Sequence, residues 1–248
     1  AENSVFINGL NVTDFYRRQS FSSAPFGFFQ EFQVKTGGYS VEFGRSTGGV
    51  INAVTRRGTN EFQGGIQSTF EPAAWRSTAD DHYYADGSTN VLSSHDRQSW
   101  IKNNIWASGP VVKDKLFLFA MFEQRDNDAS YTNALGSSWS KNESGNGFWG
   151  VKMDWQINDD HLLEMLAFSD EGEAVTDTYG YTFATATKGA YVGKSTSESG
   201  GKNGSLTYTG HFGDNFTAKA MYGVNRTQAL TYSSADELCS QVIIGTTY

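Results

Sequence analysis

Apolar and polar residues alternate in four segments of the chain, which are residues 62–71, 149–157, 206–212 and 216–224. In residues 149–157, every second residue from Trp149 to Ile157 is apolar, and the residues between them are glycine or polar. Because successive side chains of a strand point to opposite faces, each segment predicts a strand with one apolar and one polar face. Three less regular segments are also predicted as strands, which makes about seven, at residues 97–108, 115–125 and 161–170.

The predicted strands are joined alternately by short and by long connections. Tight turns are expected at residues 109–114, 158–160 and 213–215, where glycine, asparagine and aspartate gather. Long polar stretches lie between them, at residues 72–96, 127–145, 171–200 and after 228. This asymmetry is typical of an outer-membrane barrel, which has short turns on one side and long loops on the other.

A soluble β-sandwich also has alternating strands and remains the alternative. Strands of about 10 residues are long for a sandwich, in which about 5–6 is usual, but they suit a tilted membrane crossing. We therefore predict an all-β fold, namely a transmembrane antiparallel β-barrel. The aromatic residues on the apolar faces would then form outward belts at the membrane interfaces, and they are Phe70, Trp149, Trp155 and Tyr222.

Composition changes this picture little. The longest apolar run, Leu116 to Phe122, is 7 residues and mean hydropathy is −0.47, so no apolar helix of about 20 residues is available to cross a membrane. The formal charge is −8 without a basic stripe, which argues against a nucleic-acid partner. The single cysteine, Cys239, cannot form a disulfide within this chain.

One part of the sequence resembles a known family. The run GGYSVEFGRSTGGVINAVTRRGTNEFQGG, from Gly37 to Gly65, resembles the end of the plug and the first barrel strand of TonB-dependent outer-membrane receptors. AENSVFINGLNVTDF and FFQEFQVKTGG resemble earlier plug segments. NNIWASGPVVKDKLFLFAMFEQRD resembles barrel strands of the Oar-like branch.

The resemblance implies a barrel of 22 strands in the full protein with an internal plug. Residues 1–58 would be the C-terminal part of the plug, and residues 59–248 the N-terminal part of the barrel. It also implies a receptor in the outer membrane of a Gram-negative bacterium. This receptor would bind a scarce ligand through extracellular loops and import it into the periplasm. The expected partners are outer-membrane lipid, the inner-membrane TonB energising complex, an unknown ligand and a surface lipoprotein. The alternative is a surface protein that displays its loops for adhesion or for docking a lipoprotein or secreted partner.

The candidate site residues follow from the same resemblance and from the strand faces. Arg45, with Glu42 as partner or neighbour, is expected to hold the plug to acidic residues of the barrel wall, either as a latch that loosens when the plug is pulled or as a permanent staple. Turns and close packing of the plug are assigned to glycines, which are Gly37, Gly38, Gly44, Gly48 and Gly49. Four polar residues are expected to line the lumen, namely Lys152, Asp154, Glu164 and Lys219.

No enzymatic activity is expected. The histidines have no metal-ligand spacing, and no nucleophile elbow, phosphate loop or dinucleotide fingerprint occurs. We therefore predict no catalytic residues, no metal site and no cofactor. Of the three hypotheses (a transporter, a surface adhesion or docking protein, and a soluble sandwich enzyme), the enzyme is the weakest.

Overall fold

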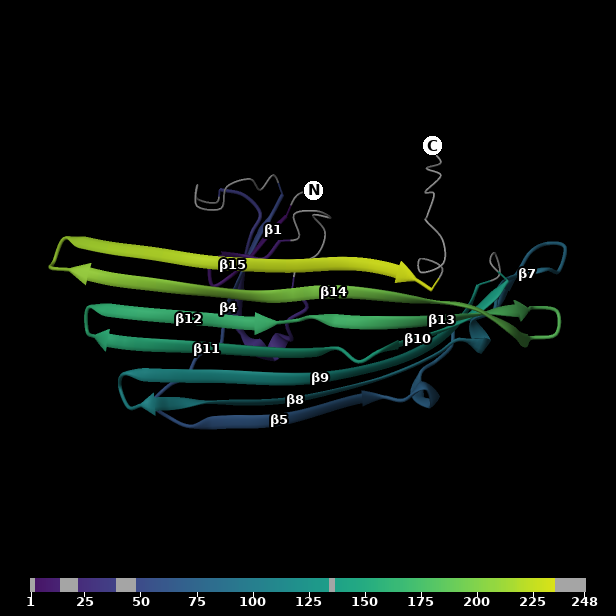
Figure 1. The fold of residues 1–248 in the computed structure, drawn as a ribbon, viewed down its shortest axis with the longest axis horizontal. Coiled ribbons are helices and arrows are strands. Elements are labelled where there is room, and N and C mark those ends of the chain that lie inside the picture. The colour runs from purple at the N-terminus through teal and green to yellow at the C-terminus, as the bar shows by residue number, and fades with distance from the viewer. Residues whose placement is uncertain (1–2, 14–21, 39–47, 134–136, 235–248) are drawn as a thin grey trace.

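The structure is a computed structural model that describes residues 3–13, 22–38, 48–133 and 137–234. It contains a large antiparallel sheet of long strands and a small N-terminal sheet that crosses one face of it (Figure 1). Among the described residues the only helices are short 3₁₀ turns. The predicted all-β, antiparallel fold class is confirmed. No helix in these ranges is long and apolar enough to span a membrane.

The small sheet has four strands in the order β2-β1-β4-β3. These are β1 (Ser4–Ile7), β2 (Leu10–Asn11), β3 (Phe29–Lys35) and β4 (Val50–Thr55). Asn8 and Gly9 connect β1 to β2 with φ angles of 48° and 85°, the left-handed values that a two-residue hairpin turn requires. A 3₁₀ turn, η1 (Phe26–Phe28), leads into β3.

The large sheet has nine strands in the order β10-β13-β14-β12-β11-β9-β8-β5, with β15 paired to β14. Its strands are β5 (Gln63–Glu71), β8 (Arg97–Val112), β9 (Leu116–Asn133), β10 (Ser138–Ser144), β11 (Gly147–Asn158), β12 (His161–Ser169), β13 (Gly172–Thr182), β14 (Thr187–Phe212) and β15 (Phe216–Ser233).

The nine strands correspond to seven long strands, which is the predicted number, because two of the long strands are each divided into two parts. β10 and β11 both pair with β9 in one register, and β12 and β13 both pair with β14 in one register. Ser144 of β10 lies opposite Ala174 of β13, and Trp149 of β11 lies opposite Ser169 of β12. The β10–β13 pair and the β11–β12 pair therefore share one register, and no residue is inserted between them. β10 and β11 thus form one long strand, as do β12 and β13, and the ladder between these two long strands opens locally around Asn146 and Asp170.

The long polar stretches differ from the prediction, because most of them are strand rather than loop. In the described parts of these stretches, residues 72–96 alone form a long irregular connection, which contains η3 (Ala73–Trp75), β6 (His82–Tyr83), β7 (Thr89–Val91) and η4 (Ser93–His95). Residues 127–133 and 138–144 pair with each other in the sheet, residues 171–200 continue it as a hairpin, and β15 extends to Ser233. Their serine and threonine side chains bond across strands, as Ser140 does with Thr178 at 3.3 Å, so a loop-like composition forms a regular ladder.

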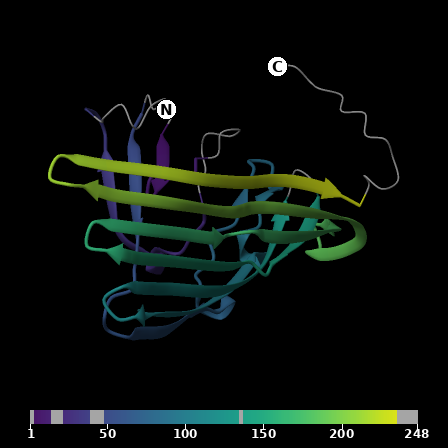
Figure 2. The same ribbon diagram turned by 60° about the vertical axis from the view of Figure 1, so that its left-hand side comes forward.

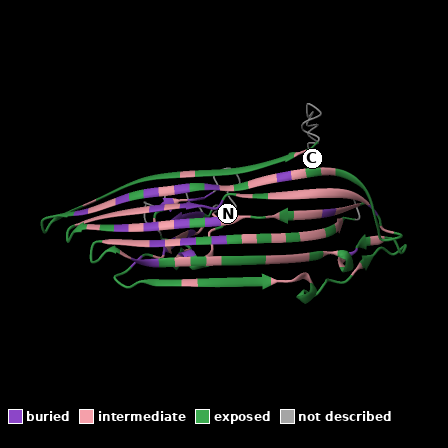
Figure 3. Cartoon of the chain, turned by 60° about the horizontal axis from the view of Figure 1, so that its bottom comes forward, coloured by how far each residue is buried: buried purple, intermediate pink, exposed green. Residues whose placement is uncertain are grey.

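The two faces of the large sheet have different surroundings. The face covered by the small sheet is called the inner face here, and the opposite one the outer face (Figure 2). Buried positions gather where the small sheet lies on the wall, in the half of the strands nearer the short turns (Figure 3). Outer positions stay exposed although they are apolar, among them Ile66 at 80% and Tyr222 at 72%.

A glycine lets the chain pass closely from the small sheet to the large one. A Cβ atom at Gly58 would lie 2.5 Å from the carbonyl oxygen of Leu118 and 2.9 Å from that of Gly109. No larger residue fits there without moving the backbone of β8 and β9.

Candidate functional site

A buried ion cluster lies on the inner face of β11 and β12. The Lys152 ammonium donates to Asp154 Oδ1 at 2.5 Å and to Glu164 Oε1 at 2.7 Å. Asp154 and Lys152 are two residues apart on one strand, and Glu164 is the cross-strand partner of Asp154. Lys152 is only 4% exposed and Asp154 5%, so each charge depends on its partners for stabilisation. The second carboxylate oxygen of Asp154 is buried and has no hydrogen-bond partner.

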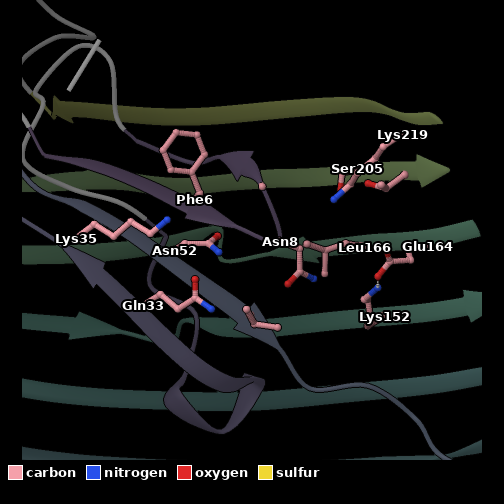
Figure 4. Close-up of a pocket in the computed structure, with 13 residues that line it drawn as sticks. Phe6, Asn8, Gln33, Lys35, Asn52, Lys152, Glu164, Leu166, Ser205 and Lys219 are labelled. Atoms are coloured by element: carbon pink, nitrogen blue, oxygen red, sulfur yellow. Dashed lines mark hydrogen bonds and ion pairs between the residues drawn. The ribbon is translucent and has the colours of Figure 1, made fainter. Parts of the chain in front are cut away.

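A polar chamber of about 450 Å³ lies between this cluster and the small sheet. Figure 4 shows that Lys152 and Glu164 lie at one side of it, with Asn8 and Asn52 of the small sheet opposite. Ser205, Thr207 and Lys219 of β14 and β15 complete the wall side, and Gln33 and Lys35 of β3 complete the other. Amides, hydroxyls and ammonium groups dominate this lining, so the chamber suits water and hydrophilic solutes rather than apolar ones.

Next to the chamber the two sheets meet in a dry aromatic contact. Phe28 is fully buried, and its ring centroid lies 5.0 Å from that of Phe148 and 6.0 Å from those of Phe119 and Phe168. A Cβ atom at Gly150 would lie 2.3 Å from the Phe28 ring. The absence of a side chain at this position therefore lets Phe28 sit directly on the wall.

Two charged residues of the wall hold the backbone of Ser23. Asp170, which is 7% exposed, accepts the Ser23 N–H at 2.7 Å and the Gly201 N–H at 2.9 Å. The Arg125 guanidinium donates to the Ser23 carbonyl at 2.8 Å and is paired with Glu123 at 2.5 Å. The carboxylate and the guanidinium thus grip the N–H and the C=O of one residue, which fixes the segment before Phe28 on the wall.

The structure brings together the four residues predicted to line the lumen. Lys152, Asp154 and Glu164 are in direct contact, and Lys219 lines the same chamber as Lys152 and Glu164. The predicted latch residues, Arg45 and Glu42, lie outside the described residues.

The five glycines assigned to the plug have different surroundings. Gly38 has a φ of +64°, which favours glycine, but a Cβ atom at Gly37 or Gly38 would meet nothing within 4 Å. At Gly49 a Cβ atom would make only ordinary contacts at 3.5 Å. Gly48 is half-buried just before β4, and Gly44 lies outside the described residues. Close packing against backbone or ring atoms is found at Gly58 and Gly150, which the sequence analysis did not single out.

Sequence reasoning missed the anchor residues Phe28, Arg125 and Asp170. Ser23 and Asp170 are 147 positions apart, so no local spacing signals their contact. Within the described ranges, no group of three His, Cys, Asp or Glu side chains is placed to hold a metal ion.

Comparison with known proteins identifies a relative. The chain is 35% identical over 136 residues to the TonB-dependent transporter Oar of Myxococcus xanthus. The match covers 55% of this chain and 13% of that transporter, so the chain spans only a small part of its relative's length. No family model matches.

A solved structure was also found. The crystal structure of BauA, the ferric preacinetobactin receptor from Acinetobacter baumannii, covers 94% of this chain and 53% of its own, with 11% identity and a TM-score of 0.30. Such a low score does not establish a shared fold. The sequence match confirms the resemblance predicted from the sequence, and the chain is similar to a TonB-dependent transporter of the Oar type.

Proposed function

We propose that this chain forms the end of the plug and the first part of the wall of a TonB-dependent outer-membrane transporter. Residues 1–58 would belong to the plug and residues 59–248 to the barrel. The observation that carries this proposal is the contrast between the two faces of the large sheet. Its inner face carries buried charges beneath the small sheet, whereas its outer face exposes aliphatic and aromatic side chains.

The height of the apolar outer surface supports a membrane setting. On β15 the apolar outer positions run from Phe216 to Val224, about 27 Å of strand at about 3.4 Å per residue, which corresponds to a height of about 21 Å at a strand tilt of about 40°. A membrane barrel has an apolar band about 25 Å tall. The band ends toward the long hairpins, where Lys202 and Arg226 are outer-face neighbours on β14 and β15.

The relative and the polar chamber support a transport function for the full protein. The transporter would bind a scarce ligand at its extracellular side and import it with energy from the inner-membrane TonB complex. Movement of the small sheet would open the chamber that contains Lys152, Glu164 and Lys219. Arg45 and Glu42 are proposed to latch the plug to the wall. No chemical step is assigned to the chain, and the ligand is left open.

The membrane setting can be tested with two neighbouring residues that face opposite ways. In the full-length protein with Cys239→Ser and no other free cysteine, a nitroxide is attached at Leu206→Cys or at Ser205→Cys. We expect the label at 206 to collide with lipid-dissolved oxygen more often than with a water-soluble nickel complex, because Leu206 is on the outer face. The label at 205 lies beneath the small sheet and should collide rarely with either. A label at 206 that collides with the nickel complex more often than with oxygen would contradict a membrane barrel.

Transport is tested in cells that carry or lack the gene, incubated with an isotope-labelled cell extract. We expect at least one labelled compound to reach the periplasm only when the protein is present and the proton-motive force is intact. If no compound depends on both, the protein is a surface adhesion or docking protein instead.

A further inference from the structure

The outer face changes character along the strands. Within the apolar band it carries residues such as Phe122 and Trp149. Further along the same strands, toward the long hairpins, the outer positions of β9 become Asp126 and Asp128. A hollow of about 790 Å³ lies at this level, and its lining contains five carboxylates and one ammonium group, from Asp126, Asp128, Glu143, Glu173, Asp177 and Lys194.

An aromatic row lies beside this hollow, on the same face. Trp139 of β10, Tyr179 of β13 and Tyr191 of β14 are cross-strand neighbours. The Trp139 and Tyr179 centroids are 5.7 Å apart, and those of Tyr179 and Tyr191 are 5.3 Å apart. The sheet places the three rings side by side on three adjacent strands, although the β13–β14 ladder shifts its register at Tyr179.

A lysine of the same chain already lies over these rings. The Lys188 ammonium lies 3.4 Å from the Tyr179 ring centroid and 4.2 Å from that of Trp139. A cation over an aromatic face is attracted by the negative charge of the ring face, and the attraction is sensitive to the ring and to its hydration. The contact shows that an ammonium group fits over these rings. We call Trp139, Tyr179 and Tyr191 the aromatic clamp.

The clamp and the hollow share a carboxylate. Asp177 lines the hollow and accepts a hydrogen bond from the Tyr191 hydroxyl at 3.4 Å. Desolvation raises the pKa of that hydroxyl, and the nearby negative charge of Asp177 raises it further. Lys141 bridges Asp128 and Glu143, which leaves the other carboxylates of the hollow to attract cations.

We propose that the aromatic clamp and the adjoining hollow form a binding site for a basic peptide segment of a partner protein. A lysine side chain of the partner replaces Lys188 over Tyr179 and Trp139, and neighbouring basic residues enter the hollow. The site lies on the outer face beyond the apolar band, away from the polar chamber. It is therefore separate from the transport path and does not depend on transport.

The test uses a dye-labelled tetralysine peptide and the purified full-length protein in uncharged detergent at low salt. Saturable binding is expected, with no binding of tetraglutamate. Trp139→Leu should weaken the binding by about two- to five-fold, the range of an exposed cation–π contact, and Trp139→Tyr should restore most of it. Lys188→Ala should strengthen it by a similar factor because it vacates the clamp.

Two controls separate the clamp from general charge. Trp149→Leu changes an outer-face tryptophan inside the apolar band and should leave binding unchanged. Lys202→Ala removes the same charge as Lys188→Ala from β14 outside the hollow and without freeing the rings, so its effect should be smaller. Heat-modifiable migration in detergent shows that each variant is folded. The proposal is overturned if tetralysine does not bind, if folded Trp139→Leu binds like the wild type, or if Lys188→Ala and Lys202→Ala strengthen binding equally.

Discussion

Replacing Lys152 by methionine should destabilise the protein strongly, because it leaves a buried carboxylate without its cation. Asp154 is 5% exposed, and its Oδ2 atom already lacks a hydrogen-bond partner. Without Lys152, its Oδ1 atom would lose the ammonium donor as well. Breaking a buried ion pair in this way costs about 3–5 kcal/mol. The Glu164 side chain is 33% exposed, so water can screen its charge and its share is expected to be below about 1 kcal/mol.

The assay is a urea titration of the full-length protein in lipid vesicles, followed by tryptophan fluorescence. The variants Lys152→Met, Asp154→Asn and Glu164→Gln are compared with the wild type at unchanged m-value. Asp154→Asn should cost about 2 kcal/mol, since Lys152 keeps its bond to Glu164 while a charged hydrogen bond is lost.

The double variant Lys152→Met/Asp154→Leu is the matched control. Removing both buried charges should return stability to within about 1 kcal/mol of the wild type, because an apolar pair of similar volume replaces a desolvated ion pair. A loss below about 1 kcal/mol for Lys152→Met alone would refute the reasoning. It would show that the cluster is hydrated when the full barrel surrounds it.

Three further perturbations test the anchor and the long connection. Gly150→Ala places a methyl group against the Phe28 ring and should cost about 1–3 kcal/mol in the same titration. Asp170→Asn keeps only one acceptor for two backbone amides, so hydrogen exchange of one of them should accelerate, and unchanged exchange would contradict the anchoring role. The Ser94 N–H and hydroxyl hold the pKa of Asp81 below its usual value of 3.8. A carboxylate whose pKa is lowered in the folded state stabilises the fold above pH 3.8, and this stabilisation is lost as the pH falls through the folded-state pKa. Protection of the Ser94 amide against hydrogen exchange should therefore decrease on acidification in the wild type but not in Asp81→Asn.

The crossings of the large sheet could be predicted from the sequence because each alternating segment reports its own two faces. The turn at 213–215 lies between β14 and β15 as expected, and Trp149 and Lys152 are on the predicted opposite faces. The less regular alternation in residues 115–125 and 161–170 has a physical cause. Phe119 and Phe168 face inward, where they contact Phe28, so these strands carry apolar residues on both faces.

The remaining features depend on contacts between distant parts of the chain. The sequence predicts loops at residues 127–145 and 171–200 because serine, threonine and asparagine are frequent there. In the structure these residues pair across strands, as Asn142 does with Thr176 at 2.8 Å. Lys152, Asp154 and Glu164 could be selected because they share one predicted face. Nothing local distinguishes Asp170 from other acidic residues near strand ends, and its role follows only from the packing of Ser23 against it.

The inner anchor and the outer boundary of the apolar band lie at the same height on the wall. On β9, Phe122 is the last apolar outer residue and Asp126 the first acidic one, and between them Arg125 holds Ser23 on the inner face. Asp170 grips the same residue where the ladder between the two long strands opens. The small sheet is therefore fastened at the level where the strands leave the apolar band, and the polar chamber lies on its short-turn side. A pull from that side would act first on the polar chamber contacts and last on the buried Phe28 contact, so we expect the chamber to be the part of this interface that opens with the least loss of packing.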